Sequence, residues 1–245
     1  MKKFLTAAVL TTALFMGNGS AEEIDYGGGA AAPAEINHAE SIYFAQPDFY
    51  NMTSAGDRII LPHYPTYQQT TDYSCGNAAA LTVLEYFGEK SFDEQALIKA
   101  MKTKPHTGTT LGNMVKFFKN IGWEVQSSLN QPPMEYAEFQ QFVIKNLTAG
   151  KPILVENVEF GGHWRVIIGC DGMGTENGYD DVLIFADPFD TADHKQDGYG
   201  VQSMDRFFSM WFDYNMLPKA ERNQAWLIAV PKEAFRGQLS AKPES

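Results

Sequence analysis

Cysteine is scarce in this chain of 245 residues, which contains only Cys75 and Cys170. Two cysteines can form at most one disulfide, so the multi-disulfide frameworks of small secreted domains are excluded. No group of cysteine and histidine residues has the spacing of a zinc site. We therefore expect neither a structural zinc ion nor any other cofactor.

Support for a calcium site is also weak. The acidic stretch that begins at Asp187 continues with Asp190, Asp193 and Asp197, and Gly198 follows it. An EF-hand loop needs oxygen ligands at alternating positions, and these residues do not alternate. We interpret the stretch as a solvated loop and predict no metal ligands, with a loose calcium site as the alternative.

A long apolar run near the N-terminus is missing as well. Residues 4–16 are apolar-leaning but too short to span a bilayer comfortably, which takes about 20 residues. Lys2 and Lys3 precede them, and the small residues 19–21 follow. This order predicts a signal peptide over residues 1–21, cleaved near Ala21, and export to the periplasm or the medium. An uncleaved N-terminal anchor is the alternative.

Basic residues are outnumbered, with 19 Lys and Arg against 30 Asp and Glu, for a net charge of -11. Removal of Lys2 and Lys3 with the signal peptide would make the chain more acidic still. Phosphate backbones and anionic lipids repel such a chain. We therefore expect no nucleic-acid partner and no membrane partner after signal cleavage, while the oligomeric state stays open.

The remaining chain is expected to form one domain. Residues 22–40 include the glycine- and alanine-rich stretch 27–33, which is typical of a flexible linker. Residues 41–236 contain enough apolar residues for one core, and residues 237–245 form a polar tail. We find no internal repeats and no coiled-coil heptads.

Helical patterns come first along the chain and strand patterns later. Apolar periodicity and glycine stops predict helices over residues 76–87, 91–101, 110–121 and 134–147. Ser91 and Glu94 have the form of a capping box for the second helix. Strands are predicted over residues 58–61, 123–127, 152–156, 164–170, 182–186 and 225–230, and a helix over 204–211 has Ser203 as its N-cap. This order predicts an α+β fold with N-terminal helices packed on an antiparallel sheet.

Cys75 is the first candidate for chemistry because it opens a predicted helix. Backbone N–H groups and the positive end of the helix dipole at that position favour a thiolate over a thiol. Only a few per cent of an ordinary thiol is ionised at neutral pH, so a nucleophilic cysteine also needs a partner base. A buried structural cysteine is the alternative reading, and it is the one we prefer for Cys170, which lies in an alternating, mostly apolar strand.

His163 and Asp187 are the candidate partners of Cys75. His163 begins a predicted strand after two glycines, and Asp187 ends the next strand. Antiparallel neighbours bring the start of one strand beside the end of the next, so Asp187 can fix the His163 ring. Acyl transfer also needs donors for the developing oxyanion. The Cys75 N–H and the side-chain amide of Gln69 are our candidates, with Gln68 as the competing amide.

Together these residues resemble the papain-like cysteine peptidases of the C39 and C39-like group. The matching motifs are Gln69 with five residues before Cys75-Gly76, the small-residue stretch Ala78-Ala79-Ala80, His163-Trp164-x-Val166-Ile167-x-Gly169 and Asp187-Pro188. The resemblance implies that Gln69 is the oxyanion glutamine, Cys75 the nucleophile, His163 the base and Asp187 the orienting residue. It covers residues 62–230 and implies a papain-like fold and a peptide or protein substrate.

In the transporter-linked members of that group, the peptidase domain precedes membrane-spanning segments and an ATPase domain. It cleaves leader peptides after paired glycines. This sequence has neither segment, so it is more similar to the stand-alone secreted members. Three alternatives stay open at this stage. The same residues could serve an acyl or aminoacyl transferase, the chain could be a non-catalytic peptide-binding protein, or Cys75 and Cys170 could form a disulfide.

Overall fold

The computed structural model describes residues 43–45, 47–193 and 195–232. The predicted signal peptide, the linker and the polar tail lie outside the described residues. Within the described residues, no helix has the length and apolar character that a membrane crossing requires.

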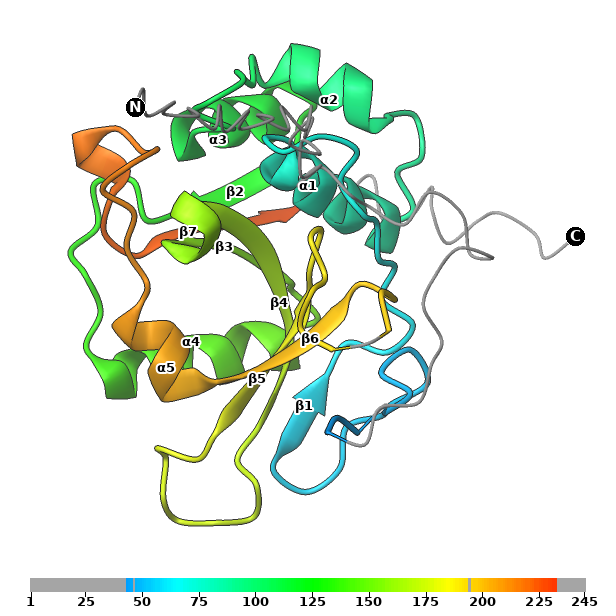
Figure 1. Ribbon diagram of the computed structural model, residues 1–245, viewed down its shortest axis with the longest axis vertical. Helices are drawn as coiled ribbons and strands as arrows, with labels where there is room; N and C mark the ends of the chain where they lie inside the picture. Colours follow the sequence, from blue (N-terminus) through cyan, green and yellow to red (C-terminus); the bar gives the residue numbers. More distant parts are fainter. Residues whose placement is uncertain (1–42, 46, 194, 233–245) are drawn as a thin grey trace, which may run out of the picture.

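The centre of the fold is a seven-stranded antiparallel sheet, in the order β2-β7-β3-β4-β5-β6 with β1 added beside β4 (Figure 1). Its strands are β1 Arg58–Ile60, β2 Glu124–Ser127, β3 Ile153–Asn157, β4 His163–Asp171, β5 Val182–Ala186, β6 Tyr199–Ser203 and β7 Ala225–Val230. The long strand β4 pairs with β3 through its first half and with β1 through its last residues. Strand β4 therefore connects most of the sheet and carries His163 at its start.

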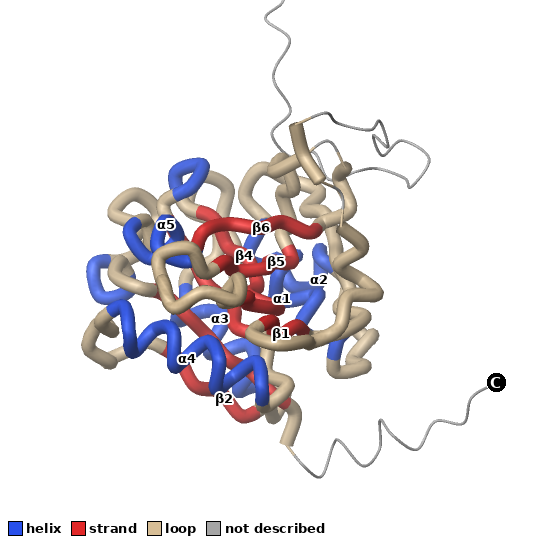
Figure 2. The backbone as a smooth tube through the Cα atoms, turned by 90° about the horizontal axis from the view of Figure 1, so that it is seen from below, coloured by secondary structure: helices blue, strands red, loops and turns tan. Residues whose placement is uncertain are grey.

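Helices cover both faces of this sheet (Figures 1 and 2). They are α1 Cys75–Tyr86, α2 Glu94–Ala100, α3 Leu111–Asn120, α4 Tyr136–Thr148 and α5 Met204–Ser209. Helix α1 packs on β4 and α3 packs on β2 and β7, whereas α4 and α5 lie on the opposite side. The predicted arrangement of helices on an antiparallel sheet is confirmed, although the helices use both of its faces.

Strand β6 is the one strand that the sequence pattern did not predict. Its five residues include Gly200 and Gln202, and Val201 is 47% exposed. With so few apolar residues, the segment gives no clear alternation. It forms because all five residues pair in register with β5, from Tyr199 opposite Ala186 onward.

The predicted capping box of α2 is wrong. Asp93 is the N-cap, and its side chain accepts a hydrogen bond from the Ala96 N–H at 2.7 Å. Glu94 is buried and accepts instead from the Thr70 N–H at 3.0 Å and the Thr70 hydroxyl at 2.5 Å. The carboxylate thus fixes the loop that leads to Cys75, and this contact between distant segments outweighs the local capping pattern.

Helix α1 is the most buried helix of the fold, and its first turn has no spare space. Ala78, Ala79 and Ala80 are fully buried. A Cβ atom on Gly76 would lie 2.9 Å from Thr109 Cβ and 3.1 Å from Trp164 Cδ1. The small residues that precede and follow Cys75 in the sequence therefore let the helix approach β4 closely.

We expect the substitution Gly76→Ala to destabilise the protein by about 1–2 kcal/mol, because overpacking outweighs the better helix propensity of alanine. Denaturant unfolding followed by circular dichroism measures this difference. Gly200→Ala is the matched control, since its Cβ would meet only the Ala192 Cβ at 3.7 Å. Equal stability of the two variants would contradict the expectation.

Candidate active site

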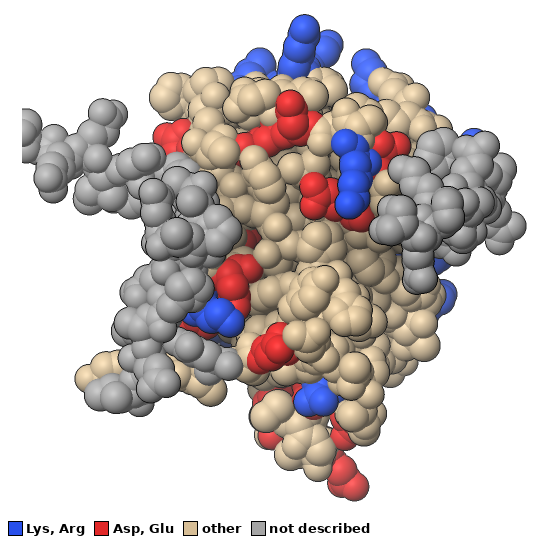
Figure 3. All heavy atoms as spheres, turned by 90° about the vertical axis from the view of Figure 1, so that its right-hand side faces the viewer, with Lys and Arg blue, Asp and Glu red and all other residues tan. Residues whose placement is uncertain are grey.

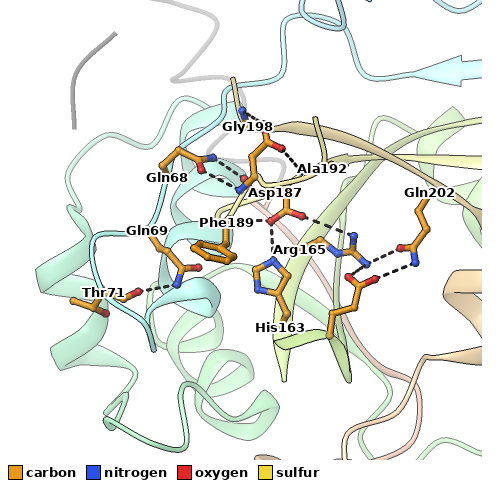
Figure 4. A network of polar contacts seen from close by, with 12 residues as sticks. Gln68, Gln69, Thr71, His163, Arg165, Asp187, Phe189, Ala192, Gly198 and Gln202 are labelled. Atoms are coloured by element: carbon orange, nitrogen blue, oxygen red, sulfur yellow. Dashed lines mark hydrogen bonds and ion pairs between the residues drawn. The ribbon is translucent and has the colours of Figure 1, made fainter. Parts of the chain in front are cut away.

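His163 and Asp187 meet where β4 begins and β5 ends. The two strands are antiparallel, with Val166 opposite Ala186, so the residue after β5 reaches the start of β4. His163 Nε2 lies 2.7 Å from Asp187 Oδ1, and both side chains are buried (Figure 4). The sequence prediction that these two residues lie together is consistent with this geometry.

Arg165 stands behind this pair and was not predicted as part of the site. Its guanidinium lies 3.8 Å from Asp187 Oδ2 and 2.8 Å from Glu159 Oε2. It also donates to Gln202 on β6 (Figure 4). Its guanidinium carbon lies 4.1 Å from the centre of the Phe185 ring. The sequence signal was present, because Arg165 follows His163 by two residues and therefore shares its face of the strand.

The charges of the site favour an imidazolium next to a carboxylate. Burial lowers the pKa of His163, but Asp187 and the Cys75 sulfur outweigh this effect and raise the pKa to about 9. Burial raises the pKa of Asp187, but His163, Arg165 and the Phe189 N–H outweigh it, so that the pKa falls below its usual value. His163 is therefore protonated at neutral pH.

Cys75 is the first residue of α1 and faces His163 across a cavity. His163 Nε2 is occupied by Asp187, so Nδ1 is the ring nitrogen left for the sulfur. The cavity has a volume of about 340 Å³, and Cys75, His163 and Gln69 contribute to its lining. The Cys75 thiol therefore shares one cavity with an imidazole that contacts a carboxylate.

The two candidate glutamines point in different directions (Figure 4). Gln69 lines the cavity, and its Nε2 donates to the Thr71 carbonyl oxygen at 2.7 Å, which leaves its second amide hydrogen free for another acceptor. Gln68 donates to the Asp187 carbonyl oxygen at 2.7 Å and accepts from the Asp190 N–H at 3.1 Å. Gln68 thus uses both its amide nitrogen and its amide oxygen to hold the loop after β5.

A family model described as papain-like cysteine protease AvrRpt2 matches residues 61–210, which is more than half of the chain. The chain belongs to this papain-like cysteine protease family. The predicted papain-like cysteine peptidase is thereby confirmed. A comparison with curated proteins found no match.

Solved structures similar to this protease include peptidase domains of ComA. One is the peptidase domain of Streptococcus ComA, a bi-functional ABC transporter involved in quorum sensing, with 20% identity, a TM-score of 0.48, and coverage of 69% of this chain and 100% of that domain. Another is the peptidase domain of Streptococcus mutans ComA, with 19% identity, a TM-score of 0.37 and the same coverage.

The second cysteine of the protease is remote from the site. Cys170 and Cys75 are both free, and both are buried. Cys170 lies seven residues after His163 on β4, which corresponds to about 23 Å of strand. The alternative of a Cys75–Cys170 disulfide is therefore wrong. Burial also raises the pKa of the Cys170 thiol to about 12, which keeps it protonated.

The acidic stretch after β5 organises its own loop. Asp190 is buried and accepts from the Ala192 and Gly198 N–H groups, and Asp193 accepts from the Lys195 N–H. Burial raises the pKa of Asp190 to about 7, although these N–H groups oppose the shift. Among the described residues, no three acidic, histidine or cysteine side chains are grouped to hold a metal ion.

Two aromatic rings form one wall of the cavity. Phe160 is 66% exposed, and its ring packs edge-on against Phe189 and His163 at centroid distances of 5.1 and 5.4 Å. Phe160 belongs to a short turn before β4 and has a φ of 53°. Sequence reasoning missed both phenylalanines, because a turn residue gives no periodic signal.

Proposed function

We propose that the protease hydrolyses peptide or related amide bonds with Cys75 as nucleophile, His163 as base and Asp187 as the orienting carboxylate. The observation that carries the proposal is the His163–Asp187 contact of 2.7 Å, which leaves the other ring nitrogen unoccupied by Asp187 in a cavity that Cys75 also lines. Family membership supports the reaction class.

In the first step the Cys75 sulfur attacks the substrate carbonyl carbon, and its electron pair forms the new C–S bond. The Cys75 N–H and the Gln69 amide donate to the oxyanion. Protonated His163 then gives its proton to the leaving amine as the C–N bond breaks. Neutral His163 removes a proton from the attacking water, and collapse of the second intermediate releases the acid and leaves the Cys75 thiolate beside protonated His163.

Asp187 and Arg165 act on this cycle through His163. Asp187 fixes the ring plane and stabilises the imidazolium, and Arg165 holds Asp187 from the far side. A buried carboxylate paired with two cationic groups stays ionised throughout the cycle. His163 consequently keeps the same orientation when it gives and when it takes a proton.

The finer assignments belong to the same proposal. The protease is of the C39-like type, is exported after cleavage of residues 1–21, and acts on a peptide or protein. The face of the molecule in Figure 3 carries scattered acidic side chains around a wide uncharged area, with basic side chains at its top edge and singly elsewhere. This distribution favours an uncharged or mixed polypeptide over nucleic acid as partner.

Alkylation by iodoacetamide tests the reactive pair without a known substrate. We expect selective labelling of Cys75 at about pH 6, since His163 stabilises the thiolate there, and loss of this labelling in His163→Ala. Peptide mapping by mass spectrometry identifies the modified residue, with Cys170 as the internal control. Equally slow labelling of the wild type and the variant would contradict the proposal and favour a non-catalytic binding protein.

A further inference from the structure

Two carboxyl groups that the proposed reaction does not use meet behind Cys75. Glu156 lies on β3 opposite Trp164, and Asp213 follows α5; they are 1% and 0% exposed. Gly162, the residue before His163, separates them from the site. A Cβ atom on Gly162 would lie 2.8 Å from Asp213 Oδ2 and 3.2 Å from Glu156 Oε1. Both carboxyl groups therefore converge on the same point of the backbone.

The two groups differ in their hydrogen-bond partners. Asp213 accepts from the Asn215 N–H at 2.6 Å and from the Met216 N–H at 3.0 Å. Neither oxygen of Glu156 has a donor at hydrogen-bonding geometry among the described residues. Burial, followed by the charge of Asp213, raises the pKa of Glu156 to about 11. At neutral pH Glu156 therefore holds a proton and can share it with Asp213.

This pair is unusual because a buried negative charge is normally matched by a cation. No ion pair in the described part of the chain involves Glu156 or Asp213. Asp213 has backbone donors, but Glu156 has none, so the pair keeps unused acceptor capacity. A ligand with several N–H donors and a positive charge would satisfy it.

A small pocket connects Glu156 with Cys75. It has a volume of about 30 Å³, and its lining includes Cys75, Glu156, Gly162 and the apolar side chains of Trp164 and Met216. A single water needs roughly 10–15 Å³ by this measure, so the space accepts one or two groups of that size. No Lys or Arg lines it, and Asp72 adds a further acidic residue.

We propose that this pocket binds a primary ammonium group of the substrate, with the Glu156–Asp213 pair as its acceptor. The inference rests on the proposed function, because it places the ammonium beside the bond that Cys75 attacks. The ammonium can come from two sources. It is either the free amino terminus of the peptide that is cleaved or a small amine, which binds as the ammonium, gives a proton to neutral His163 and then replaces water as the acyl acceptor.

Three methanethiosulfonate reagents test the pocket: the neutral methyl reagent, the aminoethyl reagent and the bulkier trimethylammonioethyl reagent. Each transfers its thioalkyl group to the Cys75 thiolate, and methanesulfinate leaves with the electron pair of the broken S–S bond. We expect the aminoethyl reagent to react roughly tenfold faster than the methyl reagent, owing to the desolvated charge contact. The rate of the trimethylammonioethyl reagent should exceed that of the methyl reagent by much less, because its head group is too large for the pocket.

The variant Glu156→Gln should reduce the aminoethyl-to-methyl rate ratio roughly fivefold or more while keeping the methyl rate, which reports that Cys75 and the fold are intact. Glu124→Gln makes the same change of side chain at an exposed residue of β2, away from the pocket, and should leave the ratio unchanged. An unchanged ratio in Glu156→Gln, or equal acceleration by both cations, would overturn the proposal. Failure of Cys75 to react with any reagent would instead overturn the proposed function.

Peptide cleavage then separates the two sources of the ammonium. Short peptides with free and with acetylated amino termini are compared, with and without added ethylamine, and the products are identified by mass spectrometry. Slower cleavage of the acetylated peptides would show that the pocket binds the free amino terminus of the substrate. Products that carry ethylamine, reduced in Glu156→Gln, assign it to the acceptor. Equal cleavage of both peptide forms with no amine incorporation would overturn the assignment of an ammonium pocket.

Discussion

Cys75→Ala is expected to abolish peptide hydrolysis, with a loss of at least about 10³–10⁴-fold in kcat. The loss follows because, among the described residues, no other thiol and no hydroxyl side chain lines the cavity with His163. The thiol is small and lies at the start of a buried helix, so alanine should fit there with little change in stability. Hydrolysis of an unfolded protein substrate, followed by gel and mass spectrometry, gives the rate, and thermal unfolding checks the fold.

Cys170→Ala is the matched control, since it removes the other buried thiol of the chain at a distance from the site. We expect full hydrolysis with this variant and a modest decrease in stability from the small cavity. Retained hydrolysis in Cys75→Ala, or equal loss in both variants, would show that the reaction does not depend on the thiol at position 75.

Asp187→Asn is expected to reduce kcat by about 10²–10⁴-fold and to move the alkaline limit of activity to lower pH. His163 must carry its proton to hold the thiolate and to protonate the leaving amine. In the wild type this form is present below the His163 pKa of about 9 and is lost as the pH rises through it. Without the carboxylate the pKa falls, so activity is lost at a lower pH.

A pH–rate profile of the wild type and the variant measures both effects. Asp193→Asn serves as the control because it lies in the same loop, where its carboxylate accepts only from the Lys195 N–H among the described residues. An alkaline limit that stays at the same pH in Asp187→Asn would exclude the assigned role of Asp187. A loss of similar size in Asp193→Asn would indicate a general effect of the loop.

Sequence reasoning worked best where a local pattern and the tertiary structure agree. The helix that begins at Cys75 and the buried strands β4 and β5 have strong apolar patterns and clear end signals. Antiparallel pairing of neighbouring strands was enough to place His163 near Asp187. The same reasoning could not choose firmly between Gln68 and Gln69, because the direction of each side chain depends on the Asp187–Asp190 loop far along the chain.

The residues that were missed owe their roles to distant partners. In the sequence alone, Arg165 resembles an ordinary strand residue. Its role depends on Glu159 and Asp187, which contact it only in the folded protein. Glu156 did carry a signal, since an acidic residue at the end of the apolar run Ile153-Leu154-Val155 is unusual in a buried strand. The pairing with Asp213 could not be foreseen, because the two residues come together only through the folded backbone at Gly162.

The double contact of Gln68 has a consequence for the timing of activity. It joins the segment before the nucleophile to a loop 119 residues further along the chain. Contacts of such long sequence separation form late in folding, after most loop closures have occurred. A partly folded chain therefore carries a thiol without its imidazole partner. The arrangement of the proposed site therefore requires the complete fold.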